Sequence, residues 1–136
     1  MQAADQFVHS GRWSGAGALK ELVKKLNLED AVRFSSSVPI AQVRAIMRRH
    51  DVMVFASNAL DGWGATVSEA LEEGVPVVGT VETGAPAALL PANRLFQCGK
   101  YRQLADILID VCQTRGRVCM PRGYTAVEAA ERILDL

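Results

Sequence analysis

The stretch from Asp51 to Thr80, which reads DVMVFASNALDGWGATVSEALEEGVPVVGT, decides the fold. It opens with an apolar run rich in β-forming residues, 51–56, and ends with a second such run, 75–80. Both patterns are typical of strands covered on both faces. Between them lie a glycine-bracketed loop and a helix-prone segment, 65–73, which Gly74 ends. Strand, loop, helix and strand in this order predict one βαβ crossover with parallel strands.

The loop that leaves the first strand has the features of a ligand site. Such a loop lies at the carboxyl edge of a parallel sheet, where the next helix directs its free N–H groups and its positive dipole end, and phosphate is the usual occupant. Gly62 and Gly64 let a ligand approach the backbone closely. Asp61 precedes the bend and Glu69 lies within the helix, with seven residues between them. Two carboxylates beside a helix start that favours anions indicate a ligand with hydroxyl groups as well as phosphate.

These residues resemble the acid-x7-acid motif of retaining glycosyltransferases with two Rossmann domains, the GT-B enzymes of the glycosyl transferases group 1 type. That family typically reads E-G-F/W-G, then E-A, then G-x-P-V-V-A/G-T. This chain has Asp61-Gly62-Trp63-Gly64, then Glu69-Ala70, then residues 74–80, with Asp in place of the commoner first Glu. A second correspondence lies outside this motif. Residues 26–34 match the family's L-G-L-x-D-x-V-x-F, and Gly11 falls at the right distance ahead of them.

The resemblance implies an α/β fold, namely a Rossmann-like three-layer αβα domain with a mostly parallel sheet. It equates residues 1–136 with a single domain, the carboxy-terminal, donor-binding half of a GT-B enzyme, truncated at its amino-terminal edge. The implied reaction transfers a glycosyl unit from a nucleotide diphosphate sugar, a UDP or GDP sugar, to a hydroxyl acceptor with retention at the anomeric carbon, as in polysaccharide biosynthesis. The nucleotide sugar is a substrate, and the resemblance implies neither a cofactor nor a metal ion.

The resemblance also assigns roles to residues of the site. Asp61 would hold sugar hydroxyls and Glu69 the ribose diol, as the catalytic pair. The helix start would stabilise the negative charge that develops on the leaving phosphate. The other donor-binding positions are Gly62, Trp63, Gly64, Ala65, Thr66, Gly84, Val38 and Gly11.

Ordinary structural roles compete with these assignments. Segment 66–69, Thr-Val-Ser-Glu, has the spacing of a capping box, in which the threonine caps the helix and the glutamate reaches back. Asp61 is also typical of an acid that caps a loop, and Gly84 of a simple turn glycine. Trp63 is expected to pack at the helix mouth, with its backbone N–H toward the donor. The serines before Val38 are equally typical of a solvated turn.

Outside the central crossover, hydrophobic periodicity predicts alternating strands and helices. Strands are expected over 6–9, 31–34 and 94–98, and helices over 18–26, 39–47, 100–114 and 124–136, with a basic link at 116–123. The basic cluster Arg48-Arg49-His50 suits the carboxyl end of the second of these helices.

The composition is that of an ordinary globular protein, with 49% apolar and 22% charged residues. Lys plus Arg and Asp plus Glu both number 15, so the charge balance indicates no nucleic-acid partner. Three cysteines without metal-ligand spacing are typical of reduced thiols. No apolar run is long enough to span a bilayer, which favours a cytoplasmic location, with contact to the inner face of the membrane left open for the full enzyme. A dinucleotide fingerprint fails because Lys20 stands where the third glycine of G-x-G-x-x-G is required.

Two parts of the family pattern are missing from these 136 residues. The relatives begin this domain with a strand, a G-R-x loop and an E-K-G segment, whose Arg and Lys neutralise the donor diphosphate, and they carry a separate amino-terminal acceptor domain. The chain alone is therefore expected to be inactive, with that acceptor domain as its missing partner. A sheet without its first strand has a bare edge, through which the chain could self-associate. Two alternatives stay open: a non-catalytic module that binds a nucleotide or a protein partner, and a sugar-nucleotide epimerase, which would need acids and histidines from another domain.

Overall fold

The computed structural model describes residues 6–9, 15–35 and 38–114. The chain divides between Val43 and Arg44 into two compact units. The expectation of a single domain over 1–136 stays a prediction. The link expected at 116–123 and the helix expected at 124–136 lie outside the described residues.

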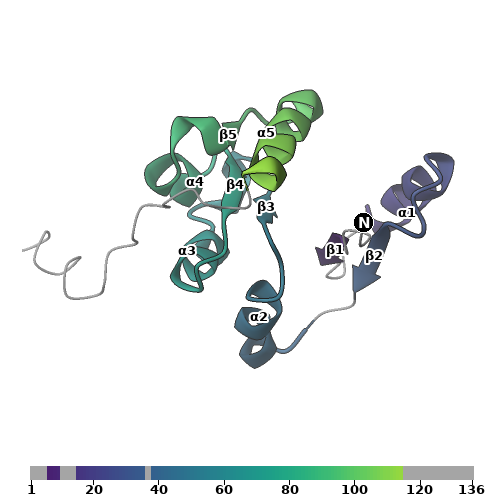
Figure 1. The fold of residues 1–136 in the computed structure, drawn as a ribbon, viewed down its shortest axis with the longest axis horizontal. Coiled ribbons are helices and arrows are strands. Elements are labelled where there is room, and N and C mark those ends of the chain that lie inside the picture. The colour runs from purple at the N-terminus through teal and green to yellow at the C-terminus, as the bar shows by residue number, and fades with distance from the viewer. Residues whose placement is uncertain (1–5, 10–14, 36–37, 115–136) are drawn as a thin grey trace, which may run out of the picture. The chain divides into compact units, whose positions relative to one another are not determined.

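The first unit is a small βαβ crossover (Figure 1). β1, Gln6–His9, pairs in parallel with β2, Val32–Ser35, so that Gln6 lies opposite Val32. α1, Ala16–Lys25, joins them, and its two lysines in the last turn complement the negative end of the helix dipole. These elements confirm the strand predicted at 6–9, as well as the helix and second strand, whose bounds shift by one or two residues.

The second unit contains the central crossover (Figure 1). Its elements, beginning with a helix that spans the boundary between the units, are α2 (Ile40–Met47), β3 (Met53–Phe55), the 3₁₀ turn η1 (Ala59–Asp61), α3 (Ala65–Glu72), β4 (Val77–Thr80), α4 (Gly84–Leu89), the 3₁₀ turn η2 (Ala92–Arg94), β5 (Leu95–Phe96) and α5 (Tyr101–Gln113). The strands form one parallel sheet in the order β3-β4-β5. The βαβ crossover predicted between residues 51 and 80 is therefore confirmed.

β4 is the centre of this sheet and is buried along its whole length. Because successive residues of a strand point to opposite faces, Val77 and Val78 divide the core into two clusters. Val77 packs with Val67 of α3 and with α4, whereas Val78 packs with Phe96 of β5 and Val111 of α5. Helices thus cover both faces of a parallel sheet, which is the three-layer α/β class that the sequence predicts.

Two helix predictions in this unit are confirmed in detail. Gly74 follows α3 with a φ of +74°, as expected for a glycine that ends a helix. α5 buries the apolar stripe that the sequence predicts, which consists of Leu104, Ile107, Leu108 and Val111. None of the helices in the described part of the chain is long and apolar enough to cross a membrane.

Three features differ from the predictions. Val54 of β3 is 38% exposed rather than covered, because it shares a sheet face with Val78, and α5 packs over β4 on that face. The segment after β4 forms a helix, α4, with Gly84 as its first residue rather than in a simple turn. The strand expected at 94–98 is reduced to Leu95–Phe96, because Arg94 belongs to η2. The guanidinium of this fully buried arginine donates from Nη1 to Oδ2 of Asp110 at 3.0 Å.

Candidate functional site

The loop between β3 and α3, residues 57–64, starts from a fixed point at the carboxyl edge of the sheet. The hydroxyl of Thr80, at the end of β4, donates to the carbonyl oxygen of Ser57 at 2.5 Å. The hydroxyl of Thr83 donates in turn to the carbonyl oxygen of Thr80 at 3.0 Å. Both threonines are buried, so these hydrogen bonds are shielded from competing water. The carboxyl ends of β3 and β4 are thereby held together.

Local backbone chemistry shapes the rest of the loop. The side chain of Asn58 accepts a hydrogen bond from the N–H of Leu60 at 3.0 Å, which starts the η1 turn. Gly62 and Gly64 then adopt φ values of +66° and +81°. A Cβ on Gly64 would lie 2.8 Å from Cζ of Phe55, so both conformation and packing require glycine there. The two glycines of the motif therefore turn the chain sharply from the strand into the helix.

The loop presents a row of backbone donors. The N–H groups of Gly84 and Ala85 donate to the carbonyl oxygens of Gly62 and Trp63, at 3.2 and 2.7 Å. Because the N–H of a trans peptide points opposite to its C=O, the next N–H groups, those of Trp63 and Gly64, point away from α4. Those two N–H groups and the first two of α3 have no acceptor among the described residues. Four consecutive donors at the positive end of a helix form a site for an anion.

The two carboxylates of the motif belong to this same segment. Asp61 ends η1 and is exposed, and Glu69 is half-buried in the second turn of α3. Helical side chains tilt toward the amino end, so Glu69 extends toward the N–H groups at the start of α3, about 6 Å away along the helix axis. Neither carboxylate has a hydrogen bond or ion pair to any described residue. Both remain available to a ligand with hydroxyl groups.

The capping box predicted at residues 66–69 is wrong. The residue that caps α3 is Gly64, in the left-handed conformation, and no side chain caps the helix. The left-handed glycine starts the helix earlier, so Thr66 lies inside the first turn rather than before it. Glu69 therefore does not have the structural role that competed with ligand binding.

The sequence-predicted site residues fall into two groups. Segment 61–66, Glu69 and Gly84 lie together at one end of α3. The indole of Trp63 meets the α-carbon side of Gly84 and is 53% exposed, so it packs only in part. Val38 belongs to the first unit and Gly11 lies outside the described residues, so their part in the site stays a prediction.

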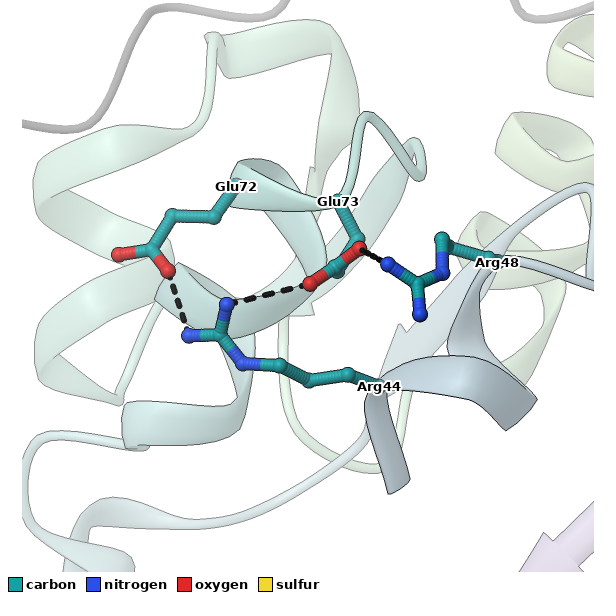
Figure 2. A network of polar contacts seen from close by, with 4 residues as sticks. All are labelled: Arg44, Arg48, Glu72 and Glu73. Carbon is teal, nitrogen blue, oxygen red and sulfur yellow. Dashed lines mark hydrogen bonds and ion pairs between the residues drawn. The ribbon is translucent and has the colours of Figure 1, made fainter. Parts of the chain in front are cut away.

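Sequence reasoning missed the buried Thr80 and Thr83, and also a charged cluster at the other end of α3 (Figure 2). Arg44 donates to Oε2 of Glu72 at 2.6 Å and to Oε1 of Glu73 at 3.1 Å, and Arg48 donates to Oε2 of Glu73 at 2.8 Å. The hydrogen bond that Arg44 donates to Glu72, followed by the negative charge of that carboxylate, raises the pKa of Arg44, which stays cationic throughout the neutral range.

This charged cluster compensates an unfavourable feature of α3. Two glutamates at the carboxyl end of a helix oppose its dipole, and the two arginines offset their charge. The available sequence signal was the pair of adjacent glutamates before Gly74, together with two arginines four positions apart, Arg44 in α2 and Arg48 directly after it.

Two hollows in the described surface lie at the turn into α5 and in the groove between η2 and α5. Their linings include Lys100 and Asp110 but neither Asp61 nor Glu69. The described residues contain no group of three or more His, Cys, Asp or Glu side chains that could hold a metal ion. Asp61, Trp63, Ala65 and Thr66 are exposed, so the candidate site is open to solvent on the described surface.

Fold and site together define a Rossmann-like α/β domain whose ligand loop lies at the carboxyl edge of its parallel sheet. The chain belongs to the glycosyl transferases group 1 family, whose model matches residues 4–119.

A mannosylfructose-phosphate synthase from Agrobacterium fabrum (strain C58 / ATCC 33970) is 41% identical over 88 residues, which are 65% of this chain and 18% of that protein. The solved structure of Anabaena Alr3699/HepE in complex with UDP-glucose matches with a TM-score of 0.69 and 22% identity, over 96% of this chain and 40% of that one. A GtfA/B complex bound to UDP and GlcNAc matches with a TM-score of 0.50 and 14% identity, over 97% of this chain and 35% of that one. The chain thus spans less than half the length of each of these relatives, and the two solved structures support the fold alone.

Proposed function

We propose that this chain supplies the donor-binding side of a glycosyltransferase, which transfers a glycosyl unit from a nucleotide diphosphate sugar to a hydroxyl acceptor. The observation that carries the proposal is the row of four N–H donors from Trp63 to Thr66, flanked by two carboxylates that have no partner among the described residues. A nucleotide diphosphate sugar is a ligand that needs both features, because it has a diphosphate between two polyhydroxylated rings.

Each group has a separate chemical task in this proposal. Asp61 accepts hydrogen bonds from hydroxyls of the transferred sugar, and Glu69 accepts them from the ribose diol. The N–H row and the dipole of α3 stabilise the charge that develops on the diphosphate as the glycosidic bond breaks. Because these N–H groups are fixed in place before the nucleotide sugar binds, the protein does not have to reorganise during the reaction.

The exposure of the candidate site indicates that a further domain is needed to enclose the nucleotide sugar. Small-molecule sites are concave and bury most of their ligand, whereas Asp61 and Trp63 are exposed on the described surface. An acceptor-binding domain, expected from the family resemblance, would close the cleft over the donor. The retaining outcome, the absence of a metal requirement and the cytoplasmic location, with or without membrane contact, stay predictions.

Titration of the full chain with UDP-glucose and with GDP-mannose tests the proposal. We expect one of the two to bind, and Glu69→Gln to weaken binding about 10- to 100-fold through loss of a charge-assisted hydrogen bond. Glu21→Gln, which changes an exposed glutamate of α1 in the same way, is the matched control and should leave the dissociation constant unchanged. Equal affinities for the Glu69→Gln variant and the wild-type chain would contradict the proposal.

The exposure of Asp61 and Trp63 also favours a second candidate, a non-catalytic module that binds the same nucleotide sugar without cleaving it. Release of free nucleotide from the bound donor, measured in the presence of a supplied acceptor domain, separates the two. Turnover that is lost in Glu69→Gln supports the transferase, and tight binding without any turnover supports the module.

A further inference from the structure

The first two residues of α4 contact the loop between β3 and α3, residues 57–64, through two successive peptide groups. The N–H groups of Gly84 and Ala85 are both directed at loop carbonyls, those of Gly62 and Trp63. Because the N–H of Gly84 is already bonded within the protein, it is not free to bind a diphosphate oxygen. Gly84 therefore needs a role other than the direct donor contact that the family resemblance implies.

The second observation is the space around Gly84. A Cβ at this position would lie 2.8 Å from Cε3 of Trp63, 3.3 Å from its Cα and 3.4 Å from the carbonyl oxygen of Gly62. The first of these contacts is too close for any side chain, and the second involves backbone, which cannot simply rotate away. The lack of a side chain at Gly84 is thus what allows the loop to close against α4.

The turn between β4 and α4, residues 81–83, is fixed by side-chain hydrogen bonds next to the loop of residues 57–64. The side chains of Thr80 and Thr83 are buried, lie 3.2 Å apart between their hydroxyl oxygens, and bond to the carbonyls of Ser57 and Thr80. The end of β4 therefore fixes the start of the loop through Thr80, and the start of α4 fixes the end of the loop through Gly84.

We propose that Gly84 is a positioning residue, which holds Trp63 and the peptide after it so that the N–H row from Trp63 to Thr66 is aimed at the donor diphosphate. This inference rests on the proposed function and deepens it, since it states how the same site is kept in shape. A side chain at residue 84 displaces Trp63 and changes the direction of the N–H groups from Trp63 to Thr66. Hydrogen bonds from these groups to a charged diphosphate depend strongly on that direction.

A double-mutant cycle tests the proposal with UDP-glucose and GDP-mannose as the titrants. We expect Gly84→Ala to raise the dissociation constant of the bound donor about 10- to 100-fold, since displacements near 1 Å have effects of this size at preorganised sites. In a Trp63→Ala background, where the closest contact is absent, the same substitution should raise it by less than about threefold. An equal effect of Gly84→Ala in both backgrounds would overturn the proposal.

A ligand-free measurement follows the displacement directly. Trp13 and Trp63 are the two tryptophans of the chain, so Trp13→Phe leaves Trp63 as the single indole reporter. In that background Gly84→Ala should move the emission maximum to longer wavelength, as the half-exposed indole of Trp63 loses its contact with residue 84. An unchanged emission maximum contradicts the positioning role, even if donor binding is altered.

The binding and fluorescence measurements distinguish failure of the proposed function from failure of the positioning role of Gly84. They also distinguish both from a loss of stability. If the wild-type chain binds neither donor, the proposed function fails, whereas the emission experiment still decides whether Gly84 holds Trp63. Val111→Ala, in the core cluster on the α5 face of the sheet, serves as a destabilised control. It should lower the melting temperature and leave both the emission maximum and the donor affinity unchanged.

Discussion

At the scale of single residues, Gly64 is the position with the least freedom in the candidate site. Its backbone is left-handed, and its α-carbon faces the ring of Phe55 in the strand before the loop. Gly62 shares the positive φ but has open space around it, with nothing within 4 Å of an added Cβ. A side chain at residue 62 therefore costs only backbone strain, whereas one at residue 64 costs backbone strain and a steric clash.

Alanine at these two positions should destabilise the chain by different amounts. We expect about 1 kcal/mol for Gly62→Ala from backbone strain alone, and at least about 2 kcal/mol for Gly64→Ala, where overpacking against Phe55 is added. Urea unfolding followed by circular dichroism measures both. Gly17→Ala, inside α1 and in open space, is the control and should be neutral or slightly stabilising. Equal losses at 62 and 64 would show that the Phe55 contact carries no cost.

The same residues mark the limit of sequence reasoning at this scale. Glycines at 62 and 64 could be predicted to shape the loop, because few residues other than glycine tolerate positive φ. Whether Thr66 caps the helix could not be decided from the sequence. The answer depends on whether Gly64 or Thr66 is the N-cap residue, and the sequence is compatible with both. Gly84 was predictable as a site residue but not as a partner of Trp63, because that contact joins residues 21 positions apart.

At the scale of elements, α2 and α3 are joined by the cluster of Arg44, Arg48, Glu72 and Glu73 (Figure 2). The two glutamates differ in their surroundings. The Glu73 side chain is 11% exposed and bonds to both arginines, whereas that of Glu72 is 53% exposed and bonds to one. Ion pairs contribute more where water is excluded and where several charges form a network.

Neutralising these glutamates one at a time should therefore have unequal effects. We expect Glu73→Gln to lower the melting temperature by about 2–4 °C, and Glu72→Gln by no more than about 1 °C. Differential scanning calorimetry at low salt measures the difference. In about 1 M NaCl the effect of Glu73→Gln should shrink, because screening weakens the interaction that the variant lacks. A larger effect for Glu72→Gln would contradict this ranking.

α4 is the element that sequence patterns did not reveal. It contains Gly84 and Pro86, both of which are unfavourable inside a helix. They are tolerated because they occupy the first turn of a helix of only six residues, where proline has no N–H partner to lose. The position of the helix depends instead on tertiary contacts of Ala85 and Pro86, which are buried.

At the scale of the whole molecule, the order of strands and helices follows from the periodicity of apolar residues. The mostly apolar run at 75–80 correctly indicated the buried central strand β4, but the similar run at 51–56 gave β3, which is exposed at Val54. The two runs cannot be told apart by composition, because burial depends on strand order in the sheet. Division into two compact units was likewise not apparent from the sequence.

Local stability should follow this distribution of burial. The amides of β4 are expected to exchange with solvent most slowly, because the strand lies between two core clusters. α1 has no buried residue, and its amides should exchange at least about a hundredfold faster. Hydrogen exchange followed by mass spectrometry compares the two segments. If the amides of α1 and β4 exchanged equally slowly, both segments would open only when the whole chain unfolds, which would contradict this prediction.

The charged cluster of α2 and α3 also bears on how this sequence can change during evolution. Reversing the charge of one member would place like charges within contact distance. Because Glu73 pairs with both arginines, reversal of a single arginine and glutamate would still leave at least one like-charge contact, and only reversal of all four charges would restore every attraction. Among homologues, the signs of the charges at 44, 48, 72 and 73 should therefore covary as one set.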